Sequence, residues 1–263
     1  MRVCLFSSYS SKNSIDNYIK FYLEMLTKHF DKTIFITNER QIDQGDLSFL
    51  AEIGVDVQLV INEGYDFGMW YKALNTIDIN KCEQIAFVND SCILFKDLDI
   101  VMQFMNSNLY DYCGITDSNQ ISYHLQSYFI VVNGRRCIDM VYEYYLLNNI
   151  IKTNDVRDII NIYEIGLPDF LAKKGFKIGS MFKYTDYPTS PNICLMNAMD
   201  IIDKGCPMIK RKLIYKTFRE HEKSFLVHHR FDFNFDYITQ IKNIIYPYNI
   251  NLEYLLDNSI FIR

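Results

Sequence analysis

Residues 84–91 read Gln-Ile-Ala-Phe-Val-Asn-Asp-Ser, an apolar run that ends in three polar side chains. β-Branched and aromatic residues in such a short run favour a buried strand. Similar runs occur at Val3–Phe6, Thr33–Thr37 and Val55–Ile61. Between these runs, apolar residues recur at helical spacing over 15–30, and Gly54 is placed to end a shorter helix. The alternation predicts βαβ units, and therefore an α/β fold with a mainly parallel central sheet flanked by helices.

The second half of the chain has a different pattern. Two apolar runs, Tyr112–Ile115 and Tyr128–Val132, predict strands that are close in sequence, with Asp117-Ser118-Asn119 as the turn chemistry between them. Helical patterns follow at about 138–149, 155–163, 168–174 and 192–204. We therefore expect an α-rich C-terminal part, joined to the first half as one compact unit over residues 1–263.

Composition and charge exclude several classes of protein. Apolar residues make up 49% and charged residues 22% of the chain, which rules out a disordered, collagen-like or coiled-coil protein. A net charge of −5 gives no general attraction to nucleic acid or anionic lipid. Seven cysteines without a CxxC pair indicate reduced thiols. The start of the chain is too weakly apolar for a signal peptide, and no run is long enough to span a membrane. We expect a soluble cytoplasmic protein.

Polar residues follow the predicted strands, at the sheet edge where ligands bind in open α/β folds. They are Ser7-Ser8-Tyr9, Asn38-Glu39 and Asn89-Asp90-Ser91. A carboxylate such as Asp90 at this edge can hold Mg²⁺ or Mn²⁺, which prefer oxygen ligands. The alternative is a simple turn or helix cap.

Two further segments carry candidate binding residues. In Glu63–Gly68, Asp66 can accept hydrogen bonds from ligand hydroxyls or cap a helix, and Gly68 permits close backbone approach to a ligand. In Tyr123–Phe129, strand alternation would place His124, Gln126 and Tyr128 on one face, which suits a polyhydroxylated ligand. A structural hydrogen-bonding role for the histidine is the alternative.

Charged residues later in the chain have both functional and structural interpretations. Glu164 precedes a predicted helix that starts at Pro168, a position where a carboxylate can act as a cap. The basic stretch Lys210–Lys212, with Lys216 and Arg219 after it, could contact phosphates or form a solvated helix face.

Taken in order, these segments resemble the rhamnan-synthesis F family of glycosyltransferases. The matching segments are Gly64–Gly68, Trp70–Leu74, Val88–Ser91, Gly114–Asp117, His124–Phe129, Glu164 with Gly175-Phe176, and Gly205–Lys210. The resemblance spans about residues 60–215. It implies a GT-A-type fold with a nucleotide-sugar-binding half over 1–110 and an acceptor-binding and catalytic half over 111–263. It also implies transfer of a sugar, often rhamnose, from a nucleotide-diphospho-sugar to a glycan or glycolipid.

The resemblance further implies roles for individual residues. Glu164 is the first candidate for the base of an inverting transfer and Asp117 the second. The donor would contact Ser8, Tyr9, Asn38, Glu39, Asp66, Gly68, Asn89 and Asp90, while His124 and Gln126 would contact the sugar or acceptor. Asp90 would hold a divalent cation, Mn²⁺ or Mg²⁺, although Asn89-Asp90-Ser91 has only one acid where the family pattern is Asp-x-Asp. A lipid-linked acceptor would allow peripheral membrane association.

Two other functions stay open from the sequence. One is a catalytically inactive module of the same fold that binds carbohydrate or nucleotide-sugar. The other is a nucleotidyltransferase or another nucleotide-sugar enzyme built on a parallel sheet, which normally carries a glycine-rich phosphate loop after its first strand. Here that turn, Ser7–Lys12, contains no glycine, which argues against the nucleotidyltransferase.

Overall fold

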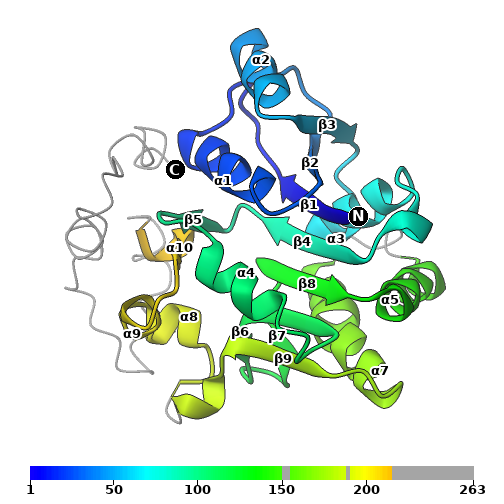
Figure 1. Ribbon diagram of the computed structural model, residues 1–263, viewed down its shortest axis with the longest axis vertical. Coiled ribbons are helices and arrows are strands. Elements are labelled where there is room, and N and C mark those ends of the chain that lie inside the picture. Colours follow the sequence, from blue (N-terminus) through cyan, green and yellow to red (C-terminus); the bar gives the residue numbers. More distant parts are fainter. Residues whose placement is uncertain (150–154, 188–189, 215–263) are drawn as a thin grey trace.

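The computed structural model describes residues 1–149, 155–187 and 190–214. In these residues, one large sheet runs through the molecule in the order β3-β2-β1-β4-β8-β6-β7, with β9 paired to β6 (Figure 1). Its strands are β1 (Arg2–Ser8), β2 (Lys32–Asn38), β3 (Val55–Val60), β4 (Gln84–Asn89), β6 (Tyr112–Ser118), β7 (His124–Leu125), β8 (Phe129–Asn133) and β9 (Ile178–Phe182).

The strands β3, β2, β1 and β4 are all parallel, so their carboxyl ends meet at one edge. Ser7 at the end of β1 lies opposite Asn89 at the end of β4. The next strand, β8, is antiparallel to both β4 and β6, and β6 is parallel to β9. The sheet is therefore mainly parallel, as the alternating sequence pattern predicts, and its topology places the polar residues after β1 and β4 side by side.

Helices cover both faces of this sheet (Figure 1). One face packs against α1 (Asn17–Thr27), α2 (Gln44–Glu52), α4 (Asp99–Met105), α8 (Ile193–Met196) and α9 (Ala198–Asp203). The other packs against α3 (Tyr65–Leu74), α5 (Arg135–Asn148), α6 (Val156–Ile159), the π-helical turn η3 (Ile160–Gly166) and α7 (Leu167–Lys173). Along β1, Cys4 and Phe6 face the first layer whereas Val3 and Leu5 face the second. Such alternation is what a strand buried on both sides requires.

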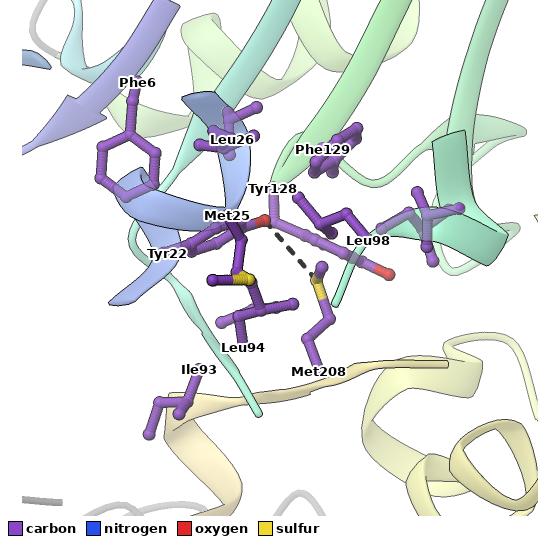
Figure 2. Packing of buried hydrophobic residues seen from close by; sticks show 14 of the residues in the cluster. Phe6, Tyr22, Met25, Leu26, Ile93, Leu94, Leu98, Tyr128, Phe129 and Met208 are labelled. Carbon is purple, nitrogen blue, oxygen red and sulfur yellow. Dashed lines mark hydrogen bonds between the residues drawn. The ribbon is translucent and has the colours of Figure 1, made fainter. Parts of the chain in front are cut away.

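A short two-stranded ribbon lies beside the large sheet. It pairs β5 (Cys92–Leu94) antiparallel with β10 (Met208–Lys210), and α10 (Arg211–Ile214) follows directly. Buried apolar side chains pack between the ribbon and α1 (Figure 2). In addition, the hydroxyl of Tyr22 on α1 donates a hydrogen bond of 3.7 Å to the sulfur of Met208 on β10. The smaller elements η1 (Ile79–Lys81) and η4 (Tyr184–Asp186) complete the described structure.

The structure corrects the sequence-based prediction for residues 117–128. Asp117 and Ser118 do not form a turn but continue β6, because hydrogen-bond partners from a later segment of the chain hold these two buried residues there. The carboxylate of Asp117 accepts a hydrogen bond from the backbone N–H of Tyr184 at 2.6 Å, and the hydroxyl of Ser118 donates to the carbonyl of Pro191 at 2.7 Å. The expected strand alternation over His124–Tyr128 is also wrong, because a turn at 127–128 separates β7 from β8.

The helical pattern over 192–204 corresponds to two helices rather than one. The break lies at Asn197, which caps the second helix, α9. The end of α2 matches its prediction, because Gly54 follows the helix with φ at +73°, a conformation that glycine adopts at little cost.

Candidate active site

Asp66 connects three elements at the carboxyl edge of the sheet. It lies in the first turn of α3 and accepts hydrogen bonds from the Ser7 hydroxyl at 3.0 Å and the Asn89 side-chain amide at 2.9 Å. These two partners end β1 and β4. Burial raises the pKa of Asp66 to about 7, and the negative charges of Asp90 and Glu164 add to the effect. Two more carboxylates therefore lie close enough to act on Asp66 electrostatically.

The glycines around Asp66 shape the turn that brings it to this edge. Gly64 has φ at +72° and precedes Tyr65, which also has a positive φ of 53°. A Cβ atom on Gly68 would overlap the carbonyl oxygen of Glu63. Gly68 therefore lies close to the backbone of Glu63. This contact within the chain explains why residue 68 is a glycine, and no ligand contact is needed to explain it.

Asp90 follows β4 and is held by three donors on the same oxygen. Its Oδ2 accepts hydrogen bonds from the Ser8 hydroxyl at 2.9 Å, the Tyr18 hydroxyl at 3.3 Å and the Arg211 guanidinium at 2.9 Å. The side chains of Asp90 and Arg211 are each 17% exposed, so this ion pair is largely withdrawn from water. The arrangement fixes the carboxylate and neutralises it from within the chain.

This set of donors does not fit the divalent cation expected at Asp90. A metal ion would have to share the carboxylate with a guanidinium that carries the same sign of charge. The neighbouring ligand candidates, Asn89 and Ser91, are themselves joined by a hydrogen bond of 2.6 Å from the Ser91 hydroxyl to Asn89 Oδ1. The described part of the chain also contains no group of three His, Cys, Asp or Glu side chains placed to share one ion.

A pocket of about 200 Å³ opens next to these residues. Polar side chains dominate its wall: Gln120, His124, Gln126, Ser127, Glu164, Asn192, Lys210 and Lys212, with Ile121, Ile160 and Leu195. Glu164, from η3, accepts a hydrogen bond of 2.5 Å from the hydroxyl of Ser127. Acidic, basic and amide groups on one wall can bind a ligand that presents several hydroxyl or phosphate oxygens.

His124 and Gln126 contribute to the pocket from the segment around β7. His124 Nδ1 lies 2.8 Å from the backbone carbonyl of Ser122, and because a carbonyl only accepts, this nitrogen carries the hydrogen. Gln126 uses its side-chain oxygen to accept a hydrogen bond from the buried thiol of Cys194. Both residues are therefore held by the chain as well as lining the pocket.

Lys210 joins the pocket to the Asp90 region. Its ammonium donates to the Ser91 hydroxyl at 3.1 Å and lies 4.5 Å from the centre of the Tyr128 ring. The same lysine lines the pocket that contains Glu164. Asp90 and Glu164 thus lie in the same region of the molecule: both act electrostatically on Asp66, and Lys210 lines the pocket of Glu164 while it contacts Ser91, the residue after Asp90.

The other predicted site residues, Tyr9, Asn38, Glu39 and Asp117, differ in their exposure and in their hydrogen bonds. Tyr9 is 58% exposed beyond β1, whereas Asn38 accepts a hydrogen bond from the backbone N–H of Ser10 at 3.0 Å. Glu39 is exposed. Asp117 does not line the pocket; burial raises its pKa, and its Oδ1 is bound by the Tyr184 N–H.

Sequence reasoning missed the roles of Tyr18 and Ser127 in this arrangement, and it did not foresee that Arg211 pairs with Asp90. For Lys210–Lys212, the sequence left phosphate contact and a solvated face open. The pairing of β10 with β5 brings this basic stretch to Asp90, and that pairing joins segments far apart in the chain. Lys216 and Arg219 lie outside the described residues.

Residues 33–262 match the family model of rhamnan synthesis protein F. Virulence protein VirA from Vibrio anguillarum (strain ATCC 68554 / 775) is 28% identical over 128 residues, which cover 44% of this chain and 38% of that protein. The match thus spans about two fifths of the length of this curated relative.

Solved structures with a similar arrangement are distant in sequence. A putative nucleotide-diphospho-sugar transferase from Desulfovibrio desulfuricans G20 is 10% identical, with 69% of this chain and 80% of that chain covered and a TM-score of 0.44. The glycosyltransferase GlyE from Streptococcus pneumoniae TIGR4 is 11% identical, with 68% and 44% covered and a TM-score of 0.38. Likenesses of this size carry no information on activity.

In the residues that the structure describes, no helix has both the length and the apolar character needed to cross a bilayer.

Proposed function

Because the chain belongs to the family of rhamnan synthesis protein F, we propose that it is a glycosyltransferase. The donor is a nucleotide-diphospho-sugar, with rhamnose as the first sugar to test, and the acceptor is a glycan or glycolipid. The proposed location is the cytoplasm, including the membrane surface if the acceptor is lipid-linked.

One observation carries the proposal: the pocket wall holds a carboxylate and an ammonium group, Glu164 and Lys210, beside the polar strand ends. Sugar transfer needs a base for the acceptor hydroxyl and a positive charge for the departing diphosphate. Both kinds of group face the same pocket, and hydroxyl-binding side chains such as His124 and Gln126 surround them. This combination supports a site for a sugar with a charged leaving group.

The proposed reaction is an inverting displacement. Glu164 takes the proton of the acceptor hydroxyl as its oxygen forms a bond to the anomeric carbon. The bond from that carbon to the diphosphate oxygen breaks, and its electron pair leaves with the diphosphate. The hydrogen bond from Ser127 to Glu164 fixes the orientation of the carboxylate.

The donor half of the proposed site lies at the ends of β1, β2 and β4. In this proposal Tyr9, Asn38 and Glu39 contact the nucleoside. Ser8 and Asn89 orient Asp90 and Asp66 through their hydrogen bonds. The remaining half, residues 111–263 in this proposal, supplies the acceptor side of the pocket. The division into 1–110 and 111–263 is part of the proposal.

The test is nucleotide release by the purified chain from a panel of dTDP-, UDP- and GDP-sugars, with glycan acceptors present. Glu164→Gln is expected to lower turnover by about 10²–10⁴-fold, the usual contribution of general base catalysis, while donor binding changes less than about threefold. Glu143→Gln, at an exposed position on α5, is the matched control and should retain full turnover.

The same panel separates the competing assignments. If Glu164→Gln turns over within threefold of wild type, Glu164 is not the base, and a large loss in Asp117→Asn would transfer that role to Asp117. Donor binding without turnover by the wild-type chain would identify a binding module in place of an enzyme.

A further inference from the structure

Backbone pairing holds a basic pair, Lys210 and Arg211, against the acidic loop after β4. In the ribbon, Lys210 lies opposite Cys92, and the N–H of Arg211 donates to the carbonyl of Ser91 at 2.9 Å. Main-chain hydrogen bonds therefore place the two cations next to Asp90.

The guanidinium of Arg211 binds both the side chain and the backbone of Asp90. One guanidinium nitrogen donates to the Asp90 carboxylate at 2.9 Å and to the Asp90 carbonyl at 3.0 Å. The guanidinium also lies 5.1 Å from the centre of the Tyr18 ring, whose hydroxyl reaches the same carboxylate. Breaking a buried ion pair leaves a charge without compensation, so a metal ion at Asp90 would have to overcome this cost and the repulsion of Arg211.

Lys210 is the cation of this pair that faces the pocket. Its ammonium contacts the Ser91 hydroxyl on one side, and the residue forms part of the pocket wall near Glu164. A diphosphate that enters the pocket meets the Glu164 carboxylate in its wall, and Asp66 lies close enough to interact with Glu164 electrostatically. Like charges at short range in a partly buried site repel strongly, so binding requires positive charge at this point.

We infer that Lys210 and Arg211 replace a divalent cation in this site: Arg211 neutralises Asp90, and Lys210 binds the diphosphate of the donor. This inference rests on the proposed function and adds to it that transfer is independent of metal ions. As the bond between sugar and diphosphate breaks, the negative charge that develops on the departing oxygen is stabilised by a hydrogen bond from the Lys210 ammonium.

The first experiment measures binding of UDP, GDP and dTDP to the full chain by calorimetry, in EDTA and in millimolar Mn²⁺ or Mg²⁺. At least one nucleoside diphosphate should bind in EDTA, with a Kd within threefold of its value in Mn²⁺. Lys210→Met should weaken this binding at least tenfold, whereas Lys210→Arg should recover most of it. Lys173→Met, which removes an exposed lysine on α7, is the control and should bind within twofold of wild type.

The second experiment uses Arg211→Met, which removes the guanidinium that pairs with Asp90. Arg211→Met should bind the nucleoside diphosphate more weakly in EDTA and regain affinity when Mn²⁺ is added, a response that wild type lacks. Circular dichroism and melting temperature confirm that each variant is folded.

Three results would overturn the inference. Wild-type binding that is at least tenfold weaker in EDTA than in Mn²⁺ would show that a metal ion is needed. Unchanged binding by Lys210→Met would remove the lysine from the site. If wild type binds no nucleoside diphosphate under any condition, the proposed function falls and this inference falls with it; in the first two cases the proposed function stands.

Discussion

The partly buried carboxyl group of Asp66, at the junction of β1, β4 and α3, gives the sharpest stability prediction. The perturbation is Asp66→Asn, which removes the titrating group and keeps its shape. Asparagine can still accept one of the two hydrogen bonds that Ser7 and Asn89 now donate to Asp66. Its amide nitrogen then faces Ser7, whose hydroxyl also lies 3.4 Å from the Val88 carbonyl. That hydroxyl can turn to the carbonyl and accept a hydrogen bond from the amide, so the substitution itself costs at most about 1 kcal/mol.

The pH dependence follows from the direction of the pKa shift. The pKa of Asp66 rises from its ordinary value of 3.8 to about 7 in the folded chain. The folded state then binds the proton more tightly than the unfolded state, so stability is greatest at low pH and falls as pH rises through this interval. With about 1.4 kcal/mol per pKa unit, the wild-type free energy of unfolding falls by about 2–3 kcal/mol from pH 5 to pH 8 because of this group.

The assay is urea unfolding of wild type and Asp66→Asn at pH 5, 6, 7 and 8. The signal is the fluorescence of Trp70, the one tryptophan of the chain, which is buried and donates to the carbonyl of Val88 at 3.2 Å. The difference between the two proteins removes the titration of other groups. Wild type should have the higher free energy of unfolding at pH 5, and the free energy of unfolding of Asp66→Asn should rise relative to that of wild type between pH 5 and pH 8. A difference that stays constant within about 0.5 kcal/mol would refute the reasoning, because a shift of this size must appear as a slope.

Two further substitutions test the geometry near the site. Gly68→Ala should lower the free energy of unfolding by more than about 2 kcal/mol, because its methyl group meets the Glu63 carbonyl; Gly45→Ala, in a helix with open space around it, is the control and should be neutral or stabilising by up to about 1 kcal/mol. Tyr18→Phe should cost about 0.5–1.5 kcal/mol in the same urea assay, because it removes one hydrogen bond to Asp90 and keeps the aromatic ring. A urea unfolding curve for Tyr18→Phe that coincides with that of wild type would mean that this hydroxyl contributes nothing to the free energy of unfolding.

The first half of the fold could be predicted from the sequence because its signals are local. Apolar runs such as Thr33–Thr37 and 84–88 are short and β-branched or aromatic, and amphipathic segments separate them. These two runs became the buried strands β2 and β4 at nearly the expected bounds. Parallel pairing then follows, since parallel strands need helical crossovers. Because parallel pairing brings the ends of β1 and β4 together, it also brings Ser8 within hydrogen-bonding distance of Asp90.

The rest of the site depends on contacts that no local pattern encodes. Asp117-Ser118-Asn119 has the composition of a turn, but hydrogen bonds with the backbone of residues 184 and 191 hold the first two residues in a strand. The strand β9, with a glycine inside it, carries too weak an apolar signal to be recognised. Lys210 and Arg211 belong to the site only because β10 pairs with β5.

The ribbon of β5 and β10 has a consequence for the order in which the site is assembled. All strands of the large sheet except β9 lie within residues 2–133, so they leave the ribosome well before residues 208–211 are synthesised. Until that later segment arrives, Asp90 has no guanidinium partner and the edge of the sheet carries an excess of negative charge. Attraction between opposite charges favours this late pairing, and the charge of Asp90 is balanced only once β10 has paired with β5.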